Sequence, residues 1–206
     1  MFKDRLDAAG QLADRLAVYR GQRPLVLAIP RGAVPMAKVI AARLEGDFDV
    51  VLVRKLRAPW QPELAVGTID ETGWTYIAPF AASMGADAQH IAQEKRLQLE
   101  TIRRRRAQYT PLRPHIAPAG RVVIVIDDGL ATGATMIAAL HALRQQQPAR
   151  LVCAVPVAPP DTLEKVRPRA DEVVCLEAPE WFQAVGQFYR QFDQVEDEEV
   201  MALLKG

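Results

Sequence analysis

Short runs of consecutive apolar residues alternate along this chain with segments that have helical spacing. The runs cover residues 24–29, 50–53, 122–126, 151–157 and 173–176. Strands that are apolar on both faces are typical of a parallel sheet covered by helices on each side. The pattern therefore predicts an α/β fold of three layers, α/β/α, around a mostly parallel central sheet.

Most segments between these runs carry apolar residues at spacings of three and four, as amphipathic helices do. Helices are predicted at residues 2–20, 34–44 and 86–109, from the loop near residue 133 to about residue 146, and after Pro160. Residues 65–69 and 74–77 flank the turn Asp70-Glu71-Thr72-Gly73 and predict a β-hairpin. We expect a single domain over residues 1–206, with its core at about 20–176 and a small aromatic-rich cap at about 177–206.

Charge and cysteine usage exclude several classes of protein. With 26 Lys and Arg against 25 Asp and Glu, the net charge of +1 provides no global field for nucleic acid or anionic membranes. No uncharged run is longer than residues 129–143, which are too few to span a bilayer, and the acidic residues at 1–7 do not fit a leader peptide. Cys153 and Cys175 lie in apolar runs, which favours two core residues in a reducing compartment over a redox pair. We expect a cytoplasmic protein without a membrane segment.

Several common catalytic arrangements are missing. The only serine, Ser83, is not in a nucleophile elbow, and His90, His115 and His141 have no partner at zinc-ligand spacing. The chain has no Gly-x4-Gly-Lys phosphate loop and no Gly-x-Gly-x-x-Gly fingerprint. These absences argue against an ordinary serine hydrolase, metalloprotease, P-loop ATPase or dinucleotide-binding enzyme.

The most informative motif follows the apolar run at 122–126. Asp127 and Asp128 come directly after it, at the end of a strand where open α/β sheets bind ligands. The next residues, 131–135, read Ala-Thr-Gly-Ala-Thr and let backbone N–H groups and two hydroxyls face the start of a helix, which suits a phosphate. The structural alternative, an acidic cap and a glycine turn, needs only one Asp. The pattern predicts a site for a phosphorylated ligand.

Residues 127–135 resemble the phosphoribosyl pyrophosphate (PRPP) signature of type I phosphoribosyltransferases. The resemblance implies that Asp127 and Asp128 are catalytic, bind the ribose 2′- and 3′-hydroxyls, and meet Mg²⁺ only through PRPP. The PRPP-binding residues it implies are Asp127, Asp128, Gly129, Ala131, Thr132, Gly133, Ala134 and Thr135, the last five for the 5′-phosphate. The hypoxanthine-guanine branch has an aspartate at the position of Ala131, so a general acid/base is missing there and the adenine branch is nearer.

A second stretch, residues 28–33 (Ala-Ile-Pro-Arg-Gly-Ala), resembles the family's pyrophosphate-binding loop. The resemblance implies pyrophosphate contacts from Arg31 and Gly32 and a cis peptide bond between Pro30 and Arg31. Arg54 and Lys55 match the Arg-Lys pair of adenine-type enzymes, which implies two more pyrophosphate ligands and catalytic roles for Arg31 and Arg54. The structural alternatives are a simple turn at residues 30–32 and a solvated face at 54–55.

The implied fold is that of the family, with the segment after residue 176 as a hood over the acceptor. Trp181 and Phe182 are its base-binding candidates, because aromatic rings stack on flat bases, although packing of the hood is an equal alternative. The implied reaction is a Mg²⁺-dependent displacement of pyrophosphate from PRPP by a nucleobase-like or other small nucleophile. PRPP and a small acceptor are therefore the expected partners, and a homodimer is left open.

Two other functions compete with this interpretation. Asp47-Phe48-Asp49 superficially matches the Asp-x-Asp of haloacid-dehalogenase phosphatases, but there the acids follow a strand, whereas here they precede one. A regulator of the same fold, which senses PRPP or nucleotides and binds RNA through residues 103–106, is the stronger competitor. Four consecutive arginines on a helix point about 100° apart and cannot form one stripe, so we do not expect nucleic acid as a partner.

Overall fold

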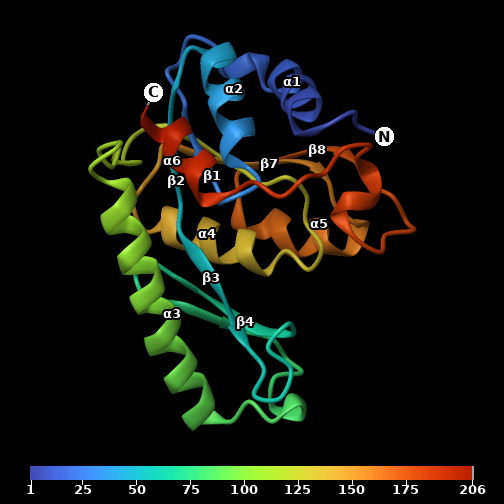
Figure 1. Cartoon of the computed structure of the whole chain (residues 1–206). Coiled ribbons are helices and arrows are strands. Elements are labelled where there is room, and N and C mark those ends of the chain that lie inside the picture. The colour runs from blue at the N-terminus through green and yellow to red at the C-terminus, as the bar shows by residue number, and fades with distance from the viewer. Residues whose placement is uncertain (206) are drawn as a thin grey trace.

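Five parallel strands form the central sheet in this computed structural model, which describes residues 1–205 (Figure 1). They are β1 (Leu25–Ala28), β2 (Asp47–Val50), β6 (Val122–Ile126), β7 (Arg150–Val157) and β8 (Glu172–Glu177). The spatial order is β2-β1-β6-β7-β8, and all the pairings are parallel. The predicted α/β fold with a mostly parallel sheet is confirmed. Gly206, the last residue of the predicted cap, lies outside the described residues.

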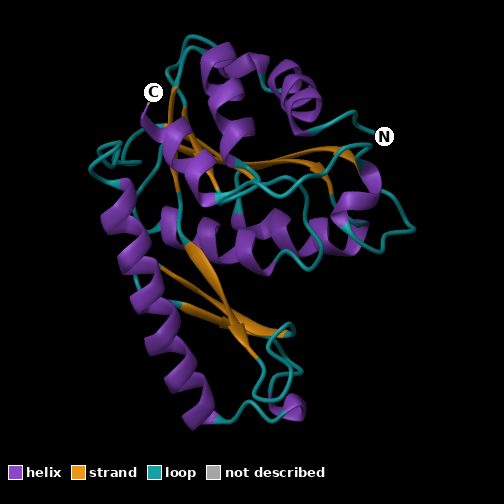
Figure 2. Cartoon of the chain, in the orientation of Figure 1, coloured by secondary structure: helices purple, strands orange, loops and turns teal. Residues whose placement is uncertain are grey.

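Helices cover both faces of this sheet (Figure 2). Helices α1 (Arg5–Arg15) and α2 (Val34–Leu44) lie on one side, and α4 (Ala134–Arg144) and α5 (Pro160–Val166) lie on the other (Figure 1). Because successive strand residues point to opposite faces, each strand feeds two buried clusters. Ile124 belongs to the cluster beneath α1 and α2, whereas Val125 and the buried Cys153 belong to the cluster beneath α4. The three predicted layers follow from this alternation.

A second, antiparallel sheet projects from the first. It contains β3 (Val53–Arg57), β4 (Ala65–Asp70) and β5 (Thr75–Ile77) in that order, and α3 (Ala88–Tyr109) runs beside it (Figure 1). We call this unit, residues 53–109, the antiparallel lobe. The predicted hairpin is present as β4 and β5, but its third strand, β3, was not predicted.

The apolar run at residues 50–53 is divided between two sheets, which corrects the predicted strand. Strand β2 ends at Val50, and β3 starts at Val53 in the lobe. Asp49 lies inside β2, where it is buried and accepts a hydrogen bond from the backbone N–H of Ile116 at 3.1 Å. A polar residue can occupy a central position in this strand because its carboxylate is satisfied from outside the sheet. Because the Asp49 carboxylate is buried, it is not accessible to a substrate, as the nucleophile of a phosphatase must be.

The predicted helix at residues 2–20 is shorter than its periodicity indicated. Asp4 caps α1 by accepting a hydrogen bond from the backbone N–H of Asp7 at 2.8 Å, and the regular helix ends at Arg15. After β8 the chain returns across the α1 and α2 side and ends in α6 (Asp197–Lys205), which packs on α2. Within the described residues, no helix is both long and apolar enough to cross a membrane.

The strand order reverses direction between β1 and β6. The two strands pair in register, with Ala28 opposite Ile126, so the loops that follow them emerge side by side. Ligands of open α/β sheets bind outside the carboxyl ends of strands at such a reversal. The fold therefore brings residues 30–32 next to residues 127–128, nearly one hundred positions apart.

Candidate active site

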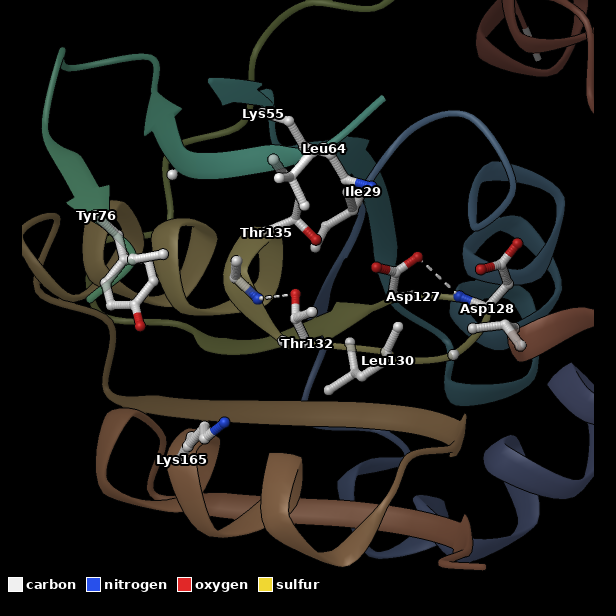
Figure 3. Close-up of a pocket in the computed structure, with 18 of the residues that line it drawn as sticks. Ile29, Lys55, Leu64, Tyr76, Asp127, Asp128, Leu130, Thr132, Thr135 and Lys165 are labelled. Carbon is white, nitrogen blue, oxygen red and sulfur yellow. Dashed lines mark hydrogen bonds between the residues drawn. The ribbon is translucent and has the colours of Figure 1, made fainter. Parts of the chain in front are cut away.

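A cavity of about 820 Å³ lies between the carboxyl edge of the parallel sheet and the antiparallel lobe. The sheet side contributes residues 29–32 and 127–135, and the lobe contributes Lys55, Leu64, Tyr76 and Phe80, among others. In Figure 3, Asp127 and Asp128 lie on one side of the view, Tyr76 and Lys165 lie on the other, and Thr132 lies between them. The cavity thus joins the two predicted phosphate-binding loops to a wall of which the sequence predicted only Lys55.

Asp127 and Asp128 occupy the end of β6 and differ in their partners. The backbone N–H of Asp128 donates to Asp127 Oδ1 at 2.9 Å (Figure 3), whereas Asp128 Oδ2 accepts from Arg5 Nε at 2.9 Å. Burial, and then the neighbouring Asp128 carboxylate, raise the pKa of Asp127 well above its ordinary value. Burial also raises the pKa of Asp128, but Arg5 opposes this increase. The pair therefore combines one carboxylate held by a cation with one held only by backbone.

Residues 131–135 turn tightly into the first turn of α4. Gly133 has φ +78°, a left-handed conformation that favours glycine, and it caps the helix. Thr162 Oγ1 fixes the loop from α5 by donating to the Ala131 carbonyl at 2.6 Å, and Thr68 Oγ1 donates to the Ala134 carbonyl at 3.1 Å from the lobe. Residues 131–135 line the cavity, so the positive dipole end of α4 faces it, and the Ala134 N–H donates to Thr132 Oγ1 at 3.4 Å. A helix N-terminus in such a position can bind an anion.

The loop at residues 30–32 lies directly beside Asp128. The Pro30–Arg31 peptide bond is cis, which confirms that prediction. A Cβ on Gly32 would collide with Asp128 Oδ2, so the close approach of loop and carboxylate requires glycine there. Arg31 Nη1 lies 3.5 Å from Glu196 Oε2 and 3.7 Å from Asp197 Oδ1. An anion in the cavity would compete with these two carboxylates for Arg31.

Arg54 and Lys55 point in opposite directions. Both lie on β3, where consecutive side chains alternate between the two faces of the sheet. Lys55 lines the cavity, whereas Arg54 Nε donates to Gln98 Oε1 on α3 at 3.0 Å and is not among the lining residues. Burial, followed by Arg105 and Arg57, lowers the pKa of Arg54. The structure brings only the lysine of the predicted pair to the site.

Trp181 and Phe182 are also not among the cavity-lining residues. The Trp181 side chain is 89% exposed, and Phe182 stacks on Phe188 with ring centroids 5.4 Å apart. From the segment after residue 177, it is Val185 that lines the cavity, next to Gly129. The aromatic residues of the lining are Tyr76 and Phe80, both from the lobe. Their stretch has no motif, so sequence patterning offered no signal for them.

The remaining polar residues of the cavity are Glu63 and Lys165. Neither was predicted, and both come from segments without a recognisable motif.

No group of three or more His, Cys, Asp or Glu side chains in residues 1–205 is arranged to hold a metal ion. The two aspartates supply oxygen atoms, which Mg²⁺ prefers, but a hexacoordinate ion would also require oxygens from a bound ligand.

Comparison with known proteins gives consistent results. A family profile described as "Phosphoribosyl transferase domain" matches residues 3–193. The crystal structure of TT1426 from Thermus thermophilus is 45% identical with a TM-score of 0.83, and the match covers 99% of this chain and 97% of that one.

Two curated relatives add to this. "Putative phosphoribosyl transferase Rv0571c" of Mycobacterium tuberculosis is 43% identical over 205 residues, which are 99% of this chain and 46% of that protein. An adenine phosphoribosyltransferase of Rhodospirillum centenum is 34% identical over 97 residues, which are 42% of this chain and 53% of that protein. The chain thus spans about half the length of the curated relatives it matches.

Proposed function

Because the chain belongs to the phosphoribosyl transferase domain family, we propose that it binds PRPP with Mg²⁺ and transfers the phosphoribosyl group to a small acceptor. One observation carries this proposal. The acid pair Asp127 and Asp128, the loop at residues 131–135 and the loop at residues 30–32 line the same cavity. These are the parts needed to hold a ribose diol and two separate phosphate groups.

The positions of the residues support the roles proposed for them. Asp127 and Asp128 accept hydrogen bonds from the ribose hydroxyls, and the N–H groups and hydroxyls at 131–135 bind the 5′-phosphate. The backbone of Gly32 and the side chains of Arg31 and Lys55 bind pyrophosphate. To do so, Arg31 must leave its ion pairs with Glu196 and Asp197. The bond from C1 to pyrophosphate breaks with its electron pair on the leaving oxygen, the lone pair of the acceptor forms a new bond to C1, and a proton carried by the attacking atom passes to water. Preorganised carboxylates near the ribose stabilise the positive charge that develops on the ring.

Magnesium fits this site as an ion shared with the substrate. Asp127 and Asp128 would hold it indirectly, through the diol oxygens that they bind, and the remaining ligands would be oxygens of PRPP and water. When bound, the ion neutralises charge on the pyrophosphate as it leaves. The cationic side chains of Lys55 and Arg31 stabilise the same negative charge on pyrophosphate.

The acceptor has an apolar wall available on the antiparallel lobe, built from Leu64, Tyr76 and Phe80. Tyr76 and Phe80 present ring surface on which a flat heterocycle can stack. A stacking role for Trp181 or Phe182 stays a prediction, and so does a pyrophosphate contact from Arg54. The two acceptor sites can be compared directly: Phe80→Ala should raise the KM for the acceptor, whereas a larger effect of Trp181→Ala would move the acceptor to the C-terminal segment.

Calorimetry with PRPP, with and without Mg²⁺, tests the proposed function. Each hydrogen bond to an ionised acceptor contributes about 1.5–3 kcal/mol, so the double variant Asp127→Asn/Asp128→Asn should bind at least one hundredfold more weakly. Affinity that is unchanged in this variant, or no binding by the wild type, would contradict the assignment. A screen of purines, pyrimidines and nicotinate-like acceptors for pyrophosphate release separates the enzyme from a regulator, which would bind PRPP without turnover.

A further inference from the structure

Asp128 is held by more contacts than the PRPP signature accounts for. Its carboxylate accepts a hydrogen bond from Arg5 Nε at 2.9 Å, and its backbone carbonyl accepts one from the Tyr189 hydroxyl at 2.6 Å. Side-chain exposure is 12% for Arg5 and 16% for Asp128, so the ion pair is largely removed from water. Removing one partner of such a buried ion pair is strongly destabilising, because the charge of the other partner is left uncompensated.

Arg5 is itself held in one orientation. Its Nη1 donates to the Asp193 carbonyl at 2.5 Å, and its guanidinium carbon lies 3.9 Å from the centre of the Phe192 ring. Nε, Nη1 and the flat face of the guanidinium are therefore engaged by three different groups. Lysine has neither the planar fork nor the face needed to reproduce this set of contacts.

A pairing between distant segments positions α1 for this contact. The Phe2 N–H donates to the Phe188 carbonyl at 2.8 Å, and the Arg190 N–H donates back to the Phe2 carbonyl at 2.9 Å. Phe2 is buried and lies 5.4 Å from the Tyr189 ring, centre to centre. Arg5 is the first residue of α1, three positions after Phe2, with the capping residue Asp4 immediately before it. The pairing thus delivers Arg5 and Tyr189 to Asp128 together.

We propose that Arg5 is a positioning residue for the PRPP site, which holds the Asp128 carboxylate in the orientation that accepts a ribose hydroxyl. This inference rests on the proposed function. It assigns a role in substrate binding to α1 and to residues 189–193, neither of which contains a recognised motif. Arg5 acts through Asp128, since Arg5 is not among the cavity-lining residues, and the Asp128 oxygen that it contacts lies next to Gly32.

A double-mutant cycle on PRPP binding in the presence of Mg²⁺ tests this role. Arg5→Met should weaken binding about tenfold, equivalent to about 1.4 kcal/mol, and Arg5→Lys should restore part of the loss because it keeps the charge. In the Asp128→Asn background, Arg5→Met should have no further effect, because the carboxylate through which it acts is already gone. Arg15→Met is the matched control, since Arg15 is an exposed arginine of the same helix.

Thermal unfolding of every variant shows whether a loss of binding reflects a loss of fold. Equal weakening by Arg5→Met in both backgrounds, or unchanged affinity in the folded Arg5→Met protein while the wild type binds PRPP, would overturn the positioning role alone. Absence of PRPP binding by the wild type would instead overturn the proposed function, and this inference with it.

Discussion

At the scale of single residues, Asp127 and Asp128 are adjacent but are stabilised in different ways. Asp128 has a cation, Arg5, whereas Asp127 is hydrogen-bonded to backbone and faces the charge of Asp128. A carboxyl group whose pKa is raised on folding opposes folding when it is ionised, so its cost grows as the pH rises above the ordinary Asp value. The protein is thus destabilised at neutral pH by the ionised Asp127 carboxylate, to which the proposed function assigns a role in binding PRPP.

We therefore expect Asp127→Asn to raise the thermal unfolding midpoint of the ligand-free protein at pH 7. The midpoint should rise by roughly 2–4 °C for each kcal/mol recovered in a domain of this size. The gain should vanish below about pH 4, where aspartate is protonated in the unfolded chain as well. Asp128→Asn should raise the midpoint by less, because Arg5 opposes the burial that raises the pKa of the Asp128 carboxyl. A lower midpoint for Asp127→Asn, or a larger gain for Asp128→Asn, would contradict this expectation.

At the scale of elements, α3 is attached to the rest of the protein by charged groups that face inward. Arg106 donates to Glu71 through Nε at 2.8 Å and through Nη2 at 2.7 Å, and Nη2 also donates to the Val50 carbonyl at 3.0 Å. Asp49, which is buried, lies 3.7 Å from Nη1. One residue of the arginine run is therefore a structural link between α3, β2 and the turn after β4.

Arg106→Met should lower the free energy of unfolding by about 3 kcal/mol, because it leaves the Asp49 and Glu71 carboxylates without this cation. Arg103→Met, in the same helix, should change it by less than about 0.5 kcal/mol, since Arg103 is exposed. Urea unfolding of the two variants measures the difference directly. Similar values for both would show that the inward contacts of Arg106 contribute little.

The same geometry limits what α3 can bind. Arg106 is committed to Glu71, and the exposed Arg103 and Arg104 are the outward members of the run. A site that neutralises several phosphates would show a steep salt dependence, with log affinity falling by about 0.7–0.9 per phosphate contact for each log unit of salt concentration. We expect no RNA or duplex DNA binding tighter than about 10 μM at physiological salt, measured by filter binding. Submicromolar binding that Arg103→Ala/Arg104→Ala abolishes would favour a regulator.

At the scale of the whole molecule, the cavity depends on how the antiparallel lobe docks on the parallel core. The Trp74 ring stacks on His141 of α4 with centroids 3.8 Å apart and an angle of 13° between the rings. Thr68 joins β4 to the first turn of the same helix. The helix whose N-terminus lines the cavity therefore also holds the lobe that contributes Leu64, Tyr76 and Phe80 to the same cavity.

Trp74→Ala should loosen the lobe without unfolding the core. An aromatic stacking pair contributes about 0.5–1.5 kcal/mol beyond its buried area, so amide hydrogen exchange in β4 and β5 should become roughly two- to tenfold faster. Exchange in β6 and β7 should be unchanged, which makes these strands the internal control. Uniform acceleration in both sheets would show that the lobe and the core open as one unit.

The sequence by itself determined the parallel sheet of this protein and the positions of the acid pair and of the loop at residues 131–135. Continuous apolar runs report burial on both faces, and Asp127 to Thr135 follow such a run directly, so local spacing was sufficient. Only the tertiary structure decided that Lys55 faces the cavity while Arg54 faces α3, because an apolar run divided between two sheets hid the start of β3. It also decided that Arg5 meets Asp128, 123 positions away. Contacts of that range depend on how elements pack together, and no periodicity within one element records them.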